Sequence, residues 1–237
     1  MIRSLFAVAC FAAFSVAALA EDDFTPLFDG KSLDGWVQRG GEATYAVEPD
    51  AEGGPQIVGT SVADTPNSFL CTERDYADFV LEFEVKVDPS LNSGVQFRSL
   101  CYDEPTTVTS TNAAGKTSER SFAAGRVHGY QAEIDPSDRG WSGGVYDEGR
   151  RGWLYKLEGD QHADARAAFK VDGWNRYRIE AVGDHISTSI NGVPVAHFHD
   201  DMTASGFIAL QVHSIGSPSQ AGKQIRWRDI KIREVTE

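Results

Sequence analysis

Three short segments of the sequence carry side chains that could bind a polar organic ligand and act on it. The segments are "GVQFRS" (Gly94–Ser99), "YQAEID" (Tyr130–Asp135) and "ALQVHS" (Ala209–Ser214), and each alternates apolar with polar residues. Successive side chains of a β-strand point to opposite faces, so each segment has one apolar and one polar face. The polar faces carry Gln96, Arg98, Gln131, Glu133, Asp135, Gln211 and His213.

The residue types on these polar faces indicate recognition of hydroxyl groups combined with acid–base chemistry. Planar amides, guanidinium groups and carboxylates bind hydroxyls through paired hydrogen bonds, as in sugar recognition. An imidazole or a carboxylate can move a proton. A face that only meets water would be richer in Lys, Glu, Thr and Ser. If the three strands are neighbours, we expect a sugar-sized polar hollow, with a plain solvent face as the alternative.

The segment Pro136–Trp153, "PSDRGWSGGVYDEGRRGW", is rich in glycine, aromatic and charged residues and almost free of aliphatic ones. Pro136 has no amide hydrogen for a central ladder, so it should end the preceding strand. We expect Ser137–Trp153 to form a loop over the rim of the hollow, in which Trp141 and Tyr146 present flat faces to a sugar ring. Packing of Trp141 and Trp153 within the rim or core is an equal alternative.

The remaining sequence predicts strands joined by turns. "DFVLEFEVKVD" (Asp78–Asp88) alternates with a period of two, and most segments after 170 behave alike. Asn191-Gly192 lies between two such runs and predicts a two-residue hairpin. One weak helix is expected at Asp160–Phe169, and the Ser/Thr/Ala/Gly-rich stretch Thr106–Gly125 is expected to be a long loop. The pattern predicts an all-β fold, a single antiparallel β-sandwich domain over residues 21–237.

The N-terminus and the charge limit where the chain acts and on what. Residues 1–20 hold one cation, Arg3, then an apolar run and a small-residue ending, which predicts a signal peptide and an exported, periplasmic or extracellular protein. Its removal changes the net charge from −13 to −14. An acidic surface repels phosphate backbones, so no nucleic acid partner is expected, and no membrane association once the signal is removed. Cys71 and Cys101 could pair or stay free.

Six motifs follow one another from about Phe24 to Val235: "FTPLFDGKSLDGW", "LNSGVQFRS", "GYQAEID", "VDGWNRYRIEAVGDHISTSINGVPV", "GFIALQVHS" and "IRWRDIKIREV". As an ordered set they resemble the DUF1080 family. The resemblance implies a concanavalin A-like jelly-roll β-sandwich. It also implies a 3-keto-glycoside lyase and 3-keto-2-hydroxy-glucal hydratase that acts on oxidised glucosides. The stretch Thr106–Gly125 is longer than its counterpart in shorter members.

The reaction that the resemblance implies suggests a role for each polar residue. A ketone at C3 of a sugar acidifies the C2 proton, so a base can remove it and the enolate can expel the C1 oxygen. We expect His213 or Glu133 as the base and Asp135 as its orienting group or as a metal ligand. The enolate oxygen would be stabilised by Arg98 or by a divalent metal ion held by the acidic residues. Hydroxyl binding is expected from Gln96, Gln131 and Gln211, and proton supply from Tyr146 or Lys156.

Three other interpretations stay open at this point. A sandwich of this type could be a lectin-like carbohydrate-binding module without catalysis. "EIDPSD" loosely matches the alternating carboxylates of a two-carboxylate glucanase, although Pro136 interrupts the strand and Asp138 stands where the last Glu is expected. "HFHDD" (His197–Asp201) places two imidazoles on one strand face and could bind a metal ion, but the sequence shows no third ligand near it, so a solvated edge strand is favoured.

Overall fold

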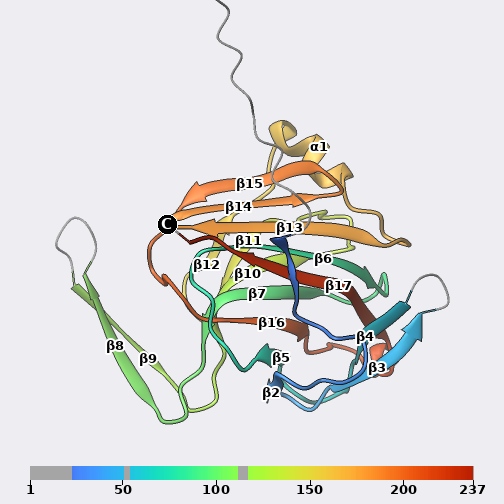
Figure 1. Ribbon diagram of the computed structural model, residues 1–237, viewed down its shortest axis with the longest axis horizontal. Helices are drawn as coiled ribbons and strands as arrows, with labels where there is room; N and C mark the ends of the chain where they lie inside the picture. The colour runs from blue at the N-terminus through green and yellow to red at the C-terminus, as the bar shows by residue number, and fades with distance from the viewer. Residues whose placement is uncertain (1–22, 51–53, 112–116, 237) are drawn as a thin grey trace, which may run out of the picture.

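The computed structural model describes residues 23–50, 54–111 and 117–236, and the predicted signal segment lies outside these ranges. Two large antiparallel sheets form a β-sandwich, which confirms the expected all-β class (Figure 1). The eight-stranded sheet contains β15 (Val193–His199), β14 (His185–Ile190), β13 (Asn175–Val182), β6 (Phe79–Val87), β17 (Gln224–Glu234), β4 (Gly54–Thr60), β3 (Thr44–Asp50) and, beside β17, β1 (Thr25–Pro26). The seven-stranded sheet contains, in order, β12 (Gly152–Tyr155), β11 (Val145–Glu148), β10 (His128–Ile134), β7 (Ser93–Leu100), β16 (Phe207–Val212), β5 (Ser68–Thr72) and β2 (Trp36–Gly40).

The core lies between the sheets and follows from the period-two alternation. Phe83 of β6 stacks on Tyr177 of β13 within the eight-stranded sheet, with ring centroids 5.1 Å apart. Phe97 of β7 stacks on Tyr130 of β10 in the other sheet, with centroids 5.5 Å apart. All four rings are at most 1% exposed. Because the apolar face of each strand is used in this way, the polar faces of β7, β10 and β16 must point out of the sandwich.

Two local predictions are confirmed. Asn191 and Gly192 have φ values of 52° and 83° and join β14 to β15 in a tight hairpin, as the Asn-Gly pair predicts. The weak helix is present but shorter than expected. It comprises a 3-10 turn at Asp160–His162 and one turn of α-helix, α1 (Ala163–Ala167), because only Ala165 is buried and little apolar surface holds it.

The prediction of a long loop at Thr106–Gly125 is wrong. β8 (Thr106–Thr111) and β9 (Thr117–Phe122) pair with each other and extend away from the sandwich, at the lower left of Figure 1. The composition is misleading because the threonines are β-branched, and β-branching favours strands even where no core is available. Facing hydroxyls also pair across the hairpin, as in the 2.8 Å contact between Thr107 Oγ1 and Ser121 Oγ.

The base of this hairpin packs on a buried histidine. Phe122 stacks on His128 with ring centroids 3.7 Å apart, and His128 is 1% exposed. Neither imidazole nitrogen of His128 has a hydrogen-bonding partner. Burial, with Arg150, Arg126 and Arg120 nearby, lowers the pKa of His128 to about 4. The folded state therefore keeps this ring neutral at pH values where the unfolded chain would protonate it.

We expect His128→Phe to stabilise the fold at acidic pH. Without the substitution, His128 binds a proton below about pH 6.5 in the unfolded chain but only near pH 4 in the folded chain. The free energy of unfolding therefore falls by about 3 kcal/mol as the pH drops across that interval. Phenylalanine keeps the stacking and removes the titration. Urea unfolding at pH 7 and pH 4.5 measures the difference. An unchanged pH dependence in the variant would show that other groups cause the acid loss.

Both cysteines of the described region are free. Cys71 is buried and Cys101 is half-buried, and both pack in a small apolar cluster with Phe69, Val127 and Phe207. Burial raises the pKa of the Cys71 thiol. No helix of the described residues is both long enough and apolar enough to cross a membrane.

Candidate functional site

The three polar strands are direct neighbours, which is the condition on which the expected polar hollow depends. β7 lies between β10 and β16, and the register places Gln131 opposite Gln96. The next row places Glu133 opposite Gly94, which in turn is opposite Gln211. Carboxylate and amide groups from separate parts of the chain therefore meet on the outer face of the seven-stranded sheet.

The three glutamines bind each other rather than standing free. The Nε2 atoms of Gln96 and Gln211 donate to Oε1 of Gln131, at 2.6 and 2.9 Å, and Nε2 of Gln131 donates to Oε2 of Glu133 at 2.9 Å. All three side chains are at most 2% exposed. The expectation that they hold substrate hydroxyls needs correction, because their groups satisfy one another. The exception is Oε1 of Gln211, which is buried without a partner and could accept a hydrogen bond from a hydroxyl or water.

Gly94 makes the convergence of these amides possible. A Cβ at this position would lie 2.5 Å from Cγ and Cδ of Gln131, so the Gln131 side chain crosses over the glycine. Any larger residue would displace it from Glu133 and Gln211. The "NSG" element of the sequence is therefore a packing requirement of the site.

We expect Gly94→Ala to disrupt the amide network and cost about 1–3 kcal/mol of stability, because the added methyl overpacks a buried position. Turnover of the substrate proposed below should fall with it. Gly216→Ala, where nothing lies within 4 Å of the added Cβ, is the matched control. Thermal unfolding and activity should be measured on both. Equal behaviour of the two variants would contradict the role given to Gly94.

Glu133 is a buried acid of this face. It is 4% exposed and accepts hydrogen bonds from Asn92 Nδ2 at 2.9 Å and from Arg139 Nη2 at 3.1 Å, besides the one from Gln131. Burial raises the pKa of Glu133, opposed by its hydrogen bonds and by Arg139, and the negative charge of Asp135 adds to the rise. A carboxyl group whose pKa is raised in this way is better suited to donating a proton than an ordinary glutamic acid.

Asp135, two residues further, has the opposite tendency. Burial alone would raise its pKa, but hydrogen bonds from the Ser137 hydroxyl and Arg139 outweigh that effect and lower it. The distances are 2.6 Å from Ser137 Oγ to Oδ1 and 2.7 Å from Arg139 Nε to Oδ2. Two neighbouring carboxyl groups with pKa values moved in opposite directions can divide acid–base work between them, with Asp135 ionised.

His213 and Asp135 line the same hollow. The hollow has a volume of about 310 Å³, and its other lining residues include Asn92, Ser214 and Gln220. His213 is half-buried, and its Nδ1 lies 2.6 Å from the carbonyl oxygen of Ser214. A carbonyl can only accept, so Nδ1 of the neutral ring carries the hydrogen and Nε2 carries the lone pair. Glu133 lies behind Asn92 at the edge of this hollow.

Arg98 does not join the site, and its predicted role is wrong. Its backbone has φ 44°, and the pairing of β7 with β10 and β16 shifts register around it, so a β-bulge reverses the side-chain direction. The guanidinium donates instead to the Ala77 and Gly183 carbonyls and to Asp78 Oδ1, each at 2.7 Å. Arg98 is 0% exposed and connects the two sheets.

Arg139, which the sequence interpretation did not single out, is the cation beside the acids. Its guanidinium contacts Glu133 and Asp135 and lies 4.8 Å above the Trp141 ring and 5.1 Å above the Trp153 ring. No sequence signal marks it, because it lies in the irregular segment after Pro136. Asn92 was also missed, although it is part of the "LNSG" motif.

The expected rim loop is only partly a loop, because it contains β11 and the start of β12. Its aromatic residues lie together: Trp141 packs edge-on against Trp153 with centroids 4.8 Å apart, and Tyr146 packs edge-on against Trp153 with centroids 5.3 Å apart. Lys156 is exposed, pairs with Glu158 at 3.4 Å and lies 5.8 Å from the Trp141 ring. Arg139 covers Trp141, so this ring is part of the rim packing, while Tyr146 of β11 is half-buried next to Gln131.

The acidic pair does not fit a divalent metal ion as it stands. Arg139, Asn92, Gln131 and Ser137 already occupy the oxygens of Glu133 and Asp135, and a positive guanidinium lies where a cation would have to bind. Across the described part of the chain, no three or more His, Cys, Asp or Glu side chains converge, in their present orientations, so that together they could hold a metal ion.

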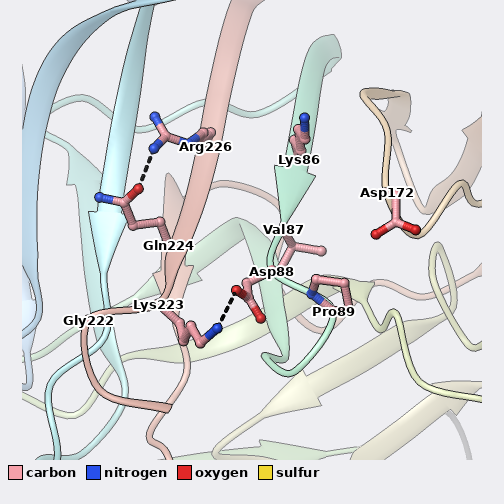
Figure 2. A pocket seen from close by; sticks show the side chains of 9 residues that line it. All are labelled: Lys86, Val87, Asp88, Pro89, Asp172, Gly222, Lys223, Gln224 and Arg226. Atoms are coloured by element: carbon pink, nitrogen blue, oxygen red, sulfur yellow. Dashed lines mark hydrogen bonds and ion pairs between the residues drawn. The ribbon is translucent and has the colours of Figure 1, made fainter. Parts of the chain in front are cut away.

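A second hollow, of about 410 Å³, lies where β6 ends and β17 begins (Figure 2). Its lining includes Lys86, Asp88, Asp172, Lys223 and Arg226. Lys223 is bound to Asp88 at 3.2 Å, and Arg226 to Gln224. None of the predicted site residues lines it, and its ionic groups partly neutralise each other, so the candidate chemistry is not located there.

Comparisons with known proteins agree with the fold and indicate the family. Residues 23–233 match the family described as the 3-keto-alpha-glucoside-1,2-lyase-like domain. No curated protein matches the chain.

Three solved structures with low sequence identity share the fold. A protein of unknown function with a galectin-like fold from Bacillus subtilis has a TM-score of 0.57 at 13% identity, over 89% of this chain and 94% of that one. A protein from Parabacteroides distasonis described as a candidate glycosyl hydrolase has 0.54 at 15%, over 92% and 98%. The carbohydrate binding module CBM66 from Bacillus subtilis has 0.53 at 16%, over 84% and 96%. Since the family match spans residues 23–233, nearly all of the described chain, this protein belongs to the 3-keto-alpha-glucoside-1,2-lyase-like (DUF1080) family.

Proposed function

We propose that the protein cleaves 3-keto-glycosides by elimination followed by hydration. Its family supports a carbohydrate-related function, and the described acids and imidazole support catalysis. The observation that carries the proposal is the shared hollow, in which His213 and Asp135 face the same space and Glu133 lies directly behind Asn92.

The proposed reaction balances without a redox partner. The base takes the C2 proton of the 3-keto sugar, and the C–H electron pair forms the enolate. The enolate expels the C1 oxygen, which takes up a proton to leave as an alcohol, and a C1–C2 double bond remains. Water then adds its oxygen to C1 and a proton returns to C2. The sum is hydrolysis of the glycosidic bond.

The residues of the hollow have separate roles in this proposal. His213 Nε2 is the base for the C2 proton, because its Nδ1 is engaged by Ser214 and its free nitrogen is directed by that contact. Glu133, whose pKa is raised by burial, returns a proton to the leaving oxygen or to C2. Arg139 takes the part expected of Arg98, and balances the enolate charge beside Asp135.

A carbohydrate-binding module is the second candidate, favoured by the structural similarity to CBM66. A two-carboxylate glucanase is less well supported. The strand ends at Ile134, before Pro136, and Asp138 is exposed, so the third carboxyl group does not share the face of Glu133 and Asp135.

Incubation of the full chain with a 3-keto disaccharide and with the same unoxidised disaccharide separates these functions. We expect cleavage of the keto sugar alone, with a transient ultraviolet absorbance from the conjugated enone. Cleavage of the unoxidised sugar alone would indicate a glucanase, and binding of either without turnover would indicate a module. Each of these two results would overturn the proposal.

We also propose that the protein is exported. The sequence of residues 1–20 supports this, and the N-terminal residue of the mature protein tests it. A mature chain that begins near Glu21 is expected, and a chain that retains residues 1–20 in the cytoplasmic fraction would refute it.

A further inference from the structure

Three histidines meet on the exposed face of the eight-stranded sheet, at its β14–β15 edge. His185 begins β14, and His197 and His199 lie in β15, with His199 directly opposite His185 in the register. The ring centroids are 4.6 Å apart for His185 and His197, 5.5 Å for His185 and His199, and 6.3 Å for His197 and His199. The third imidazole near "HFHDD" therefore comes from the neighbouring strand.

Two of these side chains already have the spacing of metal ligands. Nε2 of His185 lies 3.2 Å from Nδ1 of His197. Two nitrogens bound to one tetrahedral Zn²⁺ ion, each at about 2.0–2.1 Å, lie about 3.3 Å apart. Which of the two nitrogens donates depends on the tautomers, and a divalent ion bound beside the pair by both nitrogens would replace this hydrogen bond.

The third ring lies at the correct separation but is turned toward another group. Three imidazoles on one tetrahedral ion have centroids about 5.3 Å apart, a value that the three observed separations bracket. Nδ1 of His199 faces Asp184 Oδ1 at 3.1 Å. The three donors do not converge as they stand, and a turn of the exposed His199 side chain would bring its Nε2 toward the pair.

Asp184 has the position of an orienting carboxylate. Metal-binding histidines commonly donate their second N–H to such a group, which fixes the tautomer and leaves the other nitrogen free. The net charge of −13 also favours cations over anions at the surface.

We propose that His185, His197 and His199 form a surface site for a borderline divalent transition-metal ion such as Zn²⁺, with Asp184 orienting His199. Imidazole ligands select Zn²⁺, Cu²⁺ or Ni²⁺ over Mg²⁺ and Ca²⁺. The bound ion would connect β15 to β14 and so stabilise an exposed sheet edge. The site lies on the sheet opposite the candidate catalytic hollow and is independent of the proposed function.

Titration of the untagged, chelator-treated full chain with ZnCl₂, followed by calorimetry, tests the proposal. We expect one ion per chain, a rise in Tm on binding, and a loss of affinity of at least about tenfold in His185→Asn and in His197→Asn. Asp184→Asn should weaken binding by about tenfold through His199. His162→Asn, at a histidine outside the cluster, should bind as the unaltered chain does.

Two results would overturn the site. One is the lack of saturable Zn²⁺ binding by the unaltered chain. The other is equal affinity in the unaltered chain and in His185→Asn, which would locate the ion elsewhere; a loss confined to His213→Ala would locate it in the hollow. Broadening of the imidazole proton resonances by Cu²⁺ needs no variant. It should affect His185, His197 and His199, and broadening of other histidines alone would refute the proposal.

Discussion

Replacement of His213 by alanine is expected to lower kcat/KM for a 3-keto glycoside by about 100- to 10,000-fold, the usual contribution of a positioned general base. The half-buried ring lines the hollow together with Asp135, and its Nδ1 contact with Ser214 directs the free nitrogen. The alanine variant leaves the core intact, since no residue of the sandwich interior depends on this ring. Steady-state rates on a synthetic 3-keto glycoside measure the effect.

The matched control is His162→Ala, a half-buried histidine that contacts Tyr155 and lies outside the hollow. It should retain full activity. Isotope exchange gives a second measurement: loss of deuterium from C2 of a labelled substrate should slow in His213→Ala to the same extent as cleavage. Unchanged exchange with reduced cleavage would assign His213 to the leaving group and give the base role to Glu133.

The sequence predicts the faces of the site correctly where strands are regular. The alternation in β10 and β16 placed Gln131, Glu133 and Gln211 on one face, and their hydrogen bonds confirm it. The alternation rule assigns Gln96 and Phe97 of β7 correctly but fails at the next residue, Arg98. The backbone of Arg98 has φ 44°, and this bulge turns its side chain to the other face of the sheet. Strict alternation of side chains cannot predict where a bulge occurs.

Pairwise contacts within a face are harder to predict than the face itself. The sequence indicates that three amides lie together, but not that they bind one another and leave only one acceptor free. That result depends on Gly94, whose missing side chain lets Gln131 cross the middle strand. Likewise Arg139 reaches Glu133 and Asp135 from an irregular loop, and loop conformation has no periodic pattern from which its position could be read.

The "HFHDD" histidines and the β8–β9 hairpin also show which features a sequence can predict. The histidines of "HFHDD" gained a third neighbour because β14 pairs with β15 in a register that the Asn-Gly turn fixes. The composition of β8 and β9, rich in threonine and serine, wrongly predicts a loop. Their pairing depends on backbone hydrogen bonds, which composition does not reveal. Local turn chemistry thus predicts long-range contacts better than overall composition does.

Arg98→Met should destabilise the fold by about 3–5 kcal/mol and leave the turnover per folded molecule nearly unchanged. The guanidinium is buried and donates to two carbonyls and to Asp78, so methionine would leave these acceptors without a donor while keeping most of the volume. Urea unfolding at pH 7 measures the loss. Arg126→Met is the matched control, because Arg126 forms one ion pair with Glu148 and its side chain is 45% exposed, and it should cost at most about 1 kcal/mol.

The pair of measurements distinguishes a structural from a catalytic Arg98. The bulge turns the Arg98 side chain into the sandwich, and the hollow is lined by Asp135 and His213 but not by this guanidinium. Substitution of Arg98 should therefore change the free energy of unfolding more than it changes turnover. If Arg98→Met kept native stability and lost turnover, the guanidinium would have to reach the substrate, and Arg139 would lose the role given to it here. Arg139→Met should show the reverse, with turnover reduced and stability altered less, because its side chain is 41% exposed and its loss can be compensated by water at Asp135.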